Sequence, residues 1–119
     1  MLKTASITLI AYRIRFAAPP LGEYRWQAPQ PPESNRSSVI SAAEYGPICP
    51  QSPNGGAPLP SEYGDEDCLV LNVWAPEGAE NLPVLVYIHG GGYGAGSSQQ
   101  DLSYIINRNG NNFIGVTIQ

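Results

Sequence analysis

Basic residues are scarce in this sequence: it holds 6 Lys and Arg against 10 Asp and Glu in 119 residues, which gives a formal net charge of −4. The basic residues are scattered and form no stripe, so no nucleic acid is expected as a partner. Long apolar runs are missing as well. None approaches the roughly 18 residues that a membrane-spanning helix needs, so no transmembrane segment is predicted.

A nucleophile motif is also missing. The sequence contains no G-x-S-x-G, the strand-to-helix turn that exposes a reactive serine. Its nearest approach, residues 96–100, lacks the closing glycine, and His89 is the only histidine. A Ser-His-acid triad therefore cannot be assembled from these residues alone, and the chain by itself is expected to be inactive.

The residues that do specify a chemistry are three consecutive glycines, Gly90, Gly91 and Gly92, which follow His89 and the apolar residues 82–88. Glycine has no Cβ atom, so such a run can turn several backbone N–H groups toward one point, where an anion is held. A His-Gly-Gly-Gly run directly after a strand matches the oxyanion-hole motif of lipases and esterases. The alternative is a tight turn without a chemical role.

Two other glycine-rich motifs fit less well. Residues 92–97 place Ser97 where a dinucleotide-binding motif needs Gly or Ala, and no Lys stands nearby for a phosphate-binding loop. No cofactor and no metal are expected. We interpret His89, together with Gly90, as an anchor of the loop that acts through hydrogen bonds of the imidazole ring, rather than as a general base.

The sequence has 2 cysteines, Cys49 and Cys68, which enclose a loop rich in Pro, Gly and Ser. A bridge between them would stabilise the protein by roughly 3 kcal/mol in the chain-entropy model and would indicate an oxidising compartment. Two reduced, buried thiols in a cytosolic enzyme are the alternative. Asn35 opens a glycosylation sequon, which agrees with a secreted or extracellular location, whereas residues 1–11 resemble a signal peptide only faintly.

Few periodic segments occur in the first half of the chain. Residues 13–16 are compatible with a short strand, and the prolines that follow exclude regular helix, so we expect a surface-wrapping arm. The second half predicts a strand, a hairpin-like connection, a strand, a helix and a strand, at residues 69–75, 76–81, 83–88, 102–108 and 113–118.

The predicted helix carries its own start and stop signals. Asp101 is expected to be the N-cap and Gly110 to end the helix. Its apolar residues Leu102, Ile105 and Ile106 are expected to share one face. A right-handed crossover through this helix should place the last two strands parallel, with the glycine run at the carboxyl end of the earlier strand, where ligands bind in open α/β sheets.

Several separate blocks of sequence occur in the order of one known family. They lie at residues 17–22, 25, 49–50, 66–69, 71–76, 83–84, 89–93 and 96–97. By these blocks, residues 13–119 resemble the N-terminal part of the type-B carboxylesterases, the cholinesterase-like α/β-hydrolases. Residues 1–12 do not resemble the opening hairpin of the family and form an uncertain N-terminal segment.

The resemblance implies a fold and a set of roles. The fold would be α/β, with a mostly parallel central sheet that is incomplete in this chain. Gly91 and Gly92 would donate their N–H groups to the oxyanion, and Tyr93 would line the acyl-binding side of the site. Cys49 and Cys68 would form the first disulfide of the family. The nucleophile, acid and base would lie outside this sequence, and the substrate would be a small carboxylic ester.

Two functional hypotheses remain. The first is an ester hydrolase that works through a serine acyl-enzyme, of which this chain would be a truncated N-terminal part. The second is a cholinesterase-like binding or adhesion protein without catalysis, since the resembled family includes such proteins. The intact glycine triplet favours the enzyme, because a binding protein has no chemical need for three residues without Cβ there, although glycines also serve loop packing. Neither the ester nor the oligomeric state follows from the sequence.

Overall fold

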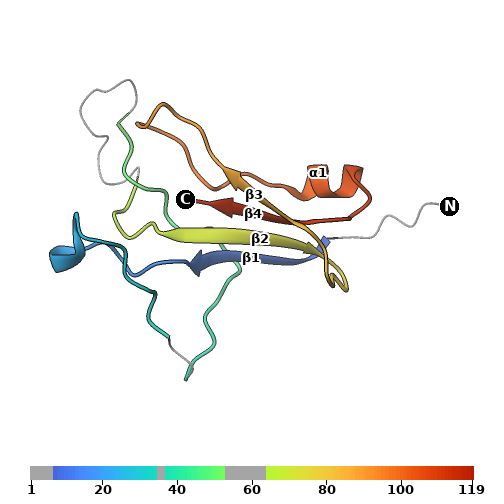
Figure 1. Cartoon of the computed structure of the whole chain (residues 1–119), viewed down its shortest axis with the longest axis horizontal. Helices are drawn as coiled ribbons and strands as arrows, with labels where there is room; N and C mark the ends of the chain where they lie inside the picture. Colours follow the sequence, from blue (N-terminus) through green and yellow to red (C-terminus); the bar gives the residue numbers. More distant parts are fainter. Residues whose placement is uncertain (1–6, 35–36, 53–63) are drawn as a thin grey trace.

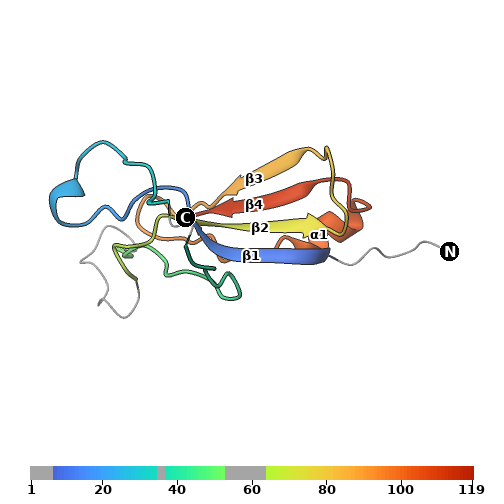
Figure 2. The same cartoon turned by 90° about the horizontal axis from the view of Figure 1, so that it is seen from below.

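The computed structural model describes residues 7–34, 37–52 and 64–119, so the sequon at Asn35 lies outside the described residues. The elements follow the order β1 (Ile7–Arg15), η1 (Gly22–Tyr24), β2 (Val70–Pro76), β3 (Val84–Ile88), α1 (Ser103–Arg108) and β4 (Ile114–Ile118). The strands lie side by side, and the long connections gather at the end of the sheet where the chain's C-terminus lies (Figures 1 and 2).

The four strands form one mixed sheet in the order β1-β2-β4-β3. Strands β3 and β4 are parallel, with Val86 opposite Val116, as expected for two strands joined by a crossover through a helix. Strand β2 is antiparallel to both of its neighbours, β1 and β4. The parallel character expected of the sheet is therefore limited, in this part of it, to β3 and β4.

The hairpin-like connection predicted between β2 and β3 is wrong. Residues 77–83 join two strands that are not neighbours, because β4 lies between them and bonds to both. A hairpin was predicted because the break is short and two apolar runs flank it. The crossover through α1 returns the chain beside β3 as strand β4. The other edge of β4 then pairs with β2, so β2 pairs with a strand that is distant in the sequence and not with β3.

Strand β1 is longer than predicted. The expected strand at residues 13–16 is only its last part, since β1 spans 9 residues from Ile7 to Arg15 and pairs with β2 along its length. The register shifts between Ala11 and Ile14, and Arg13 has a φ of +57°. Such an irregularity moves side chains to the opposite face of the sheet, which breaks the alternation by which a strand is recognised in a sequence.

Helix α1 begins one residue later than predicted, and its cap differs accordingly. The N-cap position is Leu102, while the Asp101 carboxylate accepts the N–H of Ser103 at 2.7 Å. The predicted stop at Gly110 agrees with the structure, where its φ is +68° and its N–H donates to the carbonyl of Asn107 at 3.1 Å. The N–H of Asn111 donates to the carbonyl of Ile106, which completes a Schellman motif.

The buried core is small and lies between α1 and the sheet. Trp74, Leu102 and Ile106 form it, and Gly115 of β4 lets the helix approach closely, since a Cβ there would lie 2.8 Å from Leu102 Cδ1. Ile105 was expected on the same face but is exposed. Adjacent helical residues lie about 100° apart around the axis, so Ile105 is displaced from the buried Ile106. It borders a hollow together with Leu85 and Val86 of strand β3.

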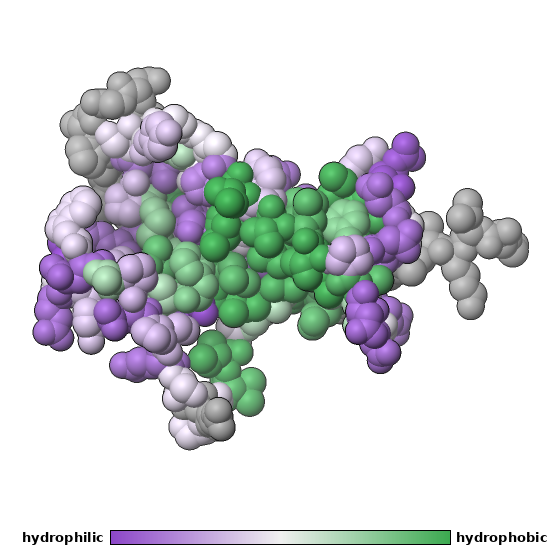
Figure 3. All heavy atoms as spheres, in the orientation of Figure 1, coloured by the Kyte–Doolittle hydropathy of each residue, from purple (hydrophilic) through white to green (hydrophobic). Residues whose placement is uncertain are grey.

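Strand β3 is apolar and yet exposed along its whole length. All five of its residues, from Val84 to Ile88, are exposed, whereas β4 alternates buried and half-buried residues. Apolar residues gather over the middle of the sheet on the face seen in Figure 3. Among the described residues, no helix is long and apolar enough to cross a membrane.

Candidate active site

The glycine loop, residues 89–96, follows the carboxyl end of β3, as predicted, and borders a hollow. The hollow has a volume of about 540 Å³ and receives its other walls from residues that precede β2 and from the chain's last residue. Its lining comprises Cys49, Pro50, Gln51, residues 89–96 and Gln119. The glycines and Tyr93, which were predicted to act on the same substrate, thus line one hollow, and Cys49 of the predicted disulfide lines it as well.

Gly91 is the residue that this loop conformation requires. Its φ is +140°, and a Cβ atom would lie 1.7 Å from the carbonyl oxygen of Ala95, well inside van der Waals contact. The N–H groups of Gly94 and Ala95 both donate to the Gly91 carbonyl, at 3.2 and 3.1 Å, and close the turn. Gly92 has a φ of +61° but open space around its Cα. Of these two glycines, Gly91 is therefore fixed as glycine by packing as well as by φ, and Gly92 by φ alone.

The backbone N–H groups of the two glycines have no partner among the residues that the structure describes. Within the described part of the chain, the N–H groups of Gly91 and Gly92 donate to no protein group, and both residues are exposed and line the hollow. A native backbone N–H without a protein partner bonds to water or to a ligand. This arrangement can therefore hold an anionic oxygen, provided that the oxygen reaches the hollow.

His89 contacts its own loop. Its Nδ1 lies 2.9 Å from the carbonyl oxygen of Gly90, and since a carbonyl only accepts, Nδ1 would be the donor. Gly96 packs against the same ring, because a Cβ there would lie 2.3 Å from His89 Nδ1 and 2.2 Å from the Gly90 oxygen. These contacts agree with an anchoring role for His89 and Gly90, which stays a prediction.

Tyr93 stands at the outer edge of the loop. It is fully exposed, lines the hollow and has a φ of +65°. Positive φ is uncommon for a residue with a side chain and is found at sites where function constrains the backbone. Its role toward the substrate stays a prediction.

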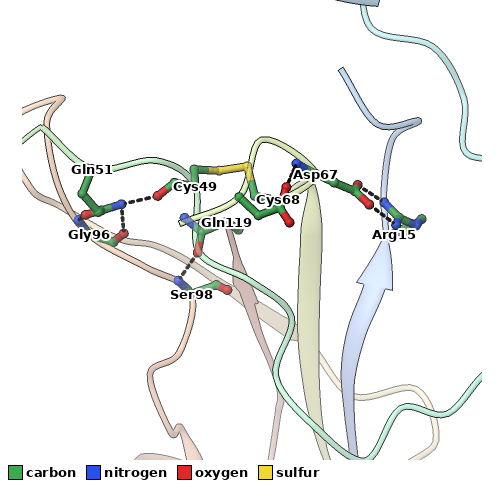
Figure 4. The surroundings of a disulfide bond; sticks show 9 residues. Arg15, Cys49, Gln51, Asp67, Cys68, Gly96, Ser98 and Gln119 are labelled. Atoms are coloured by element: carbon green, nitrogen blue, oxygen red, sulfur yellow. Dashed lines mark hydrogen bonds and ion pairs between the residues drawn. A yellow bond between two sulfur atoms is a disulfide. The ribbon is translucent and has the colours of Figure 1, made fainter. Parts of the chain in front are cut away.

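Cys49 and Cys68 form a disulfide, as the resemblance implied (Figure 4). Of the two, Cys49 lines the hollow. Cys68 lies two residues before the first residue of β2, so the bridge ties the segment at residues 49–52 to the sheet. Arg15 forms an ion pair with the adjacent Asp67 through both carboxylate oxygens, with Nη2 and Oδ2 at 2.6 Å. Hydrogen bonding from Arg15 holds the pKa of Asp67 below its usual range.

Gln51 holds the far end of the loop, and sequence reasoning missed it. Its Oε1 accepts the N–H of Gly96 at 2.7 Å, while its Nε2 donates to the carbonyls of Gly96 at 3.2 Å and of Cys49 at 2.7 Å (Figure 4). The N–H of Ser52 donates to the carbonyl of Gly94 at 2.6 Å. No local signal marks Gln51, since its partner lies 45 residues away.

A buried polar network, also missed, fixes the chain just after the loop. The Asn72 amide Nδ2 donates to the carbonyl and hydroxyl of Ser98 and to the Thr117 hydroxyl, at 3.1, 3.2 and 3.1 Å. Its Oδ1 accepts the N–H of Arg13 at 3.1 Å. Gln119 Oε1 accepts the N–H of Ser98 at 2.9 Å. A lone polar residue in an apolar strand pattern was the available signal, because such a residue needs buried partners.

Comparison with known proteins identifies the family. A family model described as the Carboxylesterase family matches residues 5–119. The chain belongs to the carboxylesterase family. It is 43% identical over 94 residues to the para-nitrobenzyl esterase of Bacillus subtilis, a match that covers 75% of this chain and 19% of that protein. It is 46% identical over 90 residues to the juvenile hormone esterase of Tribolium castaneum, a match that covers 74% of this chain and 15% of that protein.

Solved structures agree on the fold of this carboxylesterase chain. The crystal structure of Aspergillus niger EstA matches with a TM-score of 0.76 and 34% identity, covering 92% of this chain and 21% of that one. The described residues therefore have the fold of the N-terminal portion of an α/β-hydrolase. The chain spans between 15% and 19% of the length of the two curated relatives.

Proposed function

We propose that these residues form the oxyanion side of a carboxylic ester hydrolase that works through a serine acyl-enzyme. The observation that supports this most is a pair of N–H groups, those of Gly91 and Gly92, which have no partner in the described part of the chain and belong to residues that line a hollow after the carboxyl end of β3. The nucleophile, acid and base would come from sequence outside these 119 residues, which contain no G-x-S-x-G and a single histidine.

In this proposal the serine oxygen attacks the ester carbonyl carbon while the base removes the hydroxyl proton. The carbonyl oxygen becomes an oxyanion, and the N–H groups of Gly91 and Gly92 donate hydrogen bonds to it, with a third donor from the residue after the serine. Collapse of this intermediate breaks the bond to the alcohol, which leaves with the proton. Water then hydrolyses the acyl-enzyme by the same steps and releases the acid.

The remaining residues of the site would support this reaction. His89 and Gly90 would anchor the glycine loop through the contact between Nδ1 and the Gly90 carbonyl. Tyr93 would face the acyl group, since it is exposed at the edge of the hollow. The substrate would be a small carboxylic ester, with no cofactor, and the disulfide would suit secretion into an oxidising compartment.

The binding or adhesion alternative predicts a folded protein without turnover. The lack of partners for the N–H groups of Gly91 and Gly92 among the described residues favours the hydrolase. The need for glycine at position 91 does not discriminate, because a Cβ there would collide with Ala95 in either kind of protein. A binding loop could satisfy its donors within the protein, whereas catalysis needs them unsatisfied until the oxyanion forms.

The test is ester hydrolysis by the full-length protein that contains these residues, with a short-chain p-nitrophenyl ester as substrate. Turnover should be abolished by a serine-directed organophosphate, and the labelled serine should be found by peptide mapping. Residues 1–119 alone should not hydrolyse the ester above buffer. A folded full-length protein with neither turnover nor a labelled serine would refute the hydrolase and favour the binding protein.

A further inference from the structure

The side chain of Gln51 pairs with the glycine loop much as one peptide group pairs with another. Its Oε1 accepts the Gly96 N–H at 2.7 Å, and its Nε2 donates to the Gly96 carbonyl at 3.2 Å. Because a donor and an acceptor of the same residue are both engaged, Gly96 cannot shift or rotate without losing at least one bond. The half-buried position of Gln51 limits exchange of these bonds with water.

Gln51 is itself held in place by the segment that carries the disulfide. Its Nε2 also donates to the Cys49 carbonyl at 2.7 Å, and Cys49 is bridged to Cys68 immediately before β2. The N–H of Asp65 donates to the carbonyl of Ile48 at 2.8 Å, which adds a backbone bond beside the bridge. Covalent and hydrogen bonds thus connect Gly96, through Gln51 and the disulfide, to the start of β2 and hold it in place relative to the sheet.

Gly96 in turn restricts the part of the loop that carries the N–H groups of Gly91 and Gly92. It packs against the start of the loop, where a Cβ at residue 96 would lie 2.2 Å from the Gly90 oxygen and 2.3 Å from His89 Nδ1. Next to it, the Ala95 N–H donates to the Gly91 carbonyl. Movement of Gly96 would therefore displace the backbone of residues 90–92.

We propose that Gln51 is a positioning residue for the oxyanion donors: it acts through Gly96 and holds the N–H groups of Gly91 and Gly92 in the direction of the substrate oxygen. This inference rests on the proposed ester hydrolysis. Gln51 is not assigned a contact with the reacting atoms. Its loss would weaken transition-state stabilisation while leaving binding of the ground-state ester nearly unchanged, since the donors bind developing charge.

The experiment compares the full-length protein with its Gln51→Ala, Gln51→Glu and Gln30→Ala variants. Gln30 is the matched control, because among the described residues its exposed side-chain amide bonds only to the nearby carbonyl of Ala28, at 3.1 Å. For Gln51→Ala we expect kcat to fall by about 10- to 100-fold with KM within about twofold, since small misplacement of a catalytic group costs rates of this order. Gln30→Ala should match the wild type in both constants.

Gln51→Glu adds a readout that a purely structural role would not move. The ionised carboxylate keeps an acceptor for the Gly96 N–H but faces the carbonyls of Gly96 and Cys49 without a donor. Protonation restores that donor, so the ratio of kcat in Gln51→Glu to kcat in the wild type should rise as pH falls toward the pKa of the new carboxyl. His89, which lies against Gly96, is present in both proteins and cancels in the ratio.

Hydrogen exchange separates this inference from the proposed function. Peptides spanning residues 89–97 should exchange faster in Gln51→Ala than in the wild type and in Gln30→Ala, even if the protein hydrolyses no ester. An inactive wild type would refute the hydrolase alone. Wild-type kcat and unchanged exchange in a folded Gln51→Ala variant would overturn the positioning role, and so would a loss confined to KM, which would make Gln51 a substrate-binding residue.

Discussion

The glycine loop and the segment that follows it have two halves of opposite character. Residues 90–93, the open half, are exposed, and the N–H groups of Gly91 and Gly92 donate to no described protein group. Residues 94–98, the anchored half, are half-buried or buried, and other parts of the chain bond to Gly94, Gly96 and Ser98. In the proposed hydrolase the two donors stay unpaired until the oxyanion forms, while the residues beside them are held by bonds to other parts of the chain.

This difference indicates how an N–H group without a protein partner can still be held in a defined orientation. An N–H group that bonds to nothing in the protein gets no orientation from its own hydrogen bond. Its direction is set instead by φ values that few residues adopt and by neighbours that cannot move. Preorganisation of this kind is what lets a donor stabilise charge without rearrangement during the reaction. The predictions below disturb one half or the other, from the largest expected effect to the smallest.

Gly91→Ala should abolish the geometry of the open half. Its Cβ would meet the Ala95 oxygen at 1.7 Å, so the turn must open and the donors must shift. In the full-length protein kcat should fall by about 10²- to 10³-fold, the loss typical of an oxyanion donor. Gly92→Ala should cost less, because the space is open and only the positive φ, a strain of about 1–2 kcal/mol, opposes the side chain.

Steady-state kinetics on a short-chain ester, with folding checked by circular dichroism, measures both variants. Gly78→Ala is the control for positive φ, since Gly78 also has a φ near that of Gly92 and open surroundings, but lies in the connection after β2. If folded Gly91→Ala keeps the wild-type kcat, the glycine triplet is only a packing turn.

The double variant Cys49→Ser, Cys68→Ser removes the base of the anchored half. The bridge spans 19 positions, for which the chain-entropy model gives about 3 kcal/mol of stability. The free energy of unfolding in urea should fall by about that amount, and non-reducing peptide mapping of the natural protein should find the two cysteines joined. Two freely alkylated thiols in native material would contradict the bridge.

Asn72→Ala should release the anchored half from the sheet. Asn72 is 1% exposed, and its loss leaves the Arg13 N–H and the Ser98 carbonyl with fewer partners in a buried place. The free energy of unfolding should fall by about 1–3 kcal/mol. The exposed Asn107 of α1 provides the control, since Asn107→Ala should leave the urea midpoint nearly unchanged. Equal midpoints for both variants would show that the network adds no stability.

Asp67→Asn should have the smallest effect, because the ion pair with Arg15 lies outside both halves and is partly exposed. The exposed fraction of the side chain is 25% for Asp67 and 35% for Arg15. The loss of stability at neutral pH should stay below about 1 kcal/mol. Since Arg15 lowers the pKa of Asp67 in the folded state, the pair contributes above the unfolded pKa, near 4, and the contribution disappears as pH falls through the folded pKa.

Urea midpoints of the wild type and of Asp67→Asn at neutral pH and at about pH 3 test this sign, because the difference should shrink at the lower pH. Glu80→Gln, which removes an exposed acid between β2 and β3, controls for the change in net charge. A difference that grows at low pH would contradict the assignment to Asp67.

The sequence by itself determined the features that depend on neighbours along the chain. Three glycines after an apolar run predicted the loop at the end of β3, and the stop signal at Gly110 agrees with the end of α1. A helix between two apolar runs predicted that β3 and β4 are parallel. These features follow from φ preferences, periodicity and crossover handedness, which act over a few residues or a single unit.

Only the tertiary structure decided which distant segments meet. Nothing local to β2 indicates that β4 pairs with it, so a hairpin was predicted where a third strand intervenes. Gln51 lies in an irregular segment, and its bonds to Gly96 exist because the disulfide and the sheet bring residues 45 positions apart together. Hydrogen bonds of this kind join atoms that come together only when the sheet has formed. A local sequence pattern therefore cannot predict them.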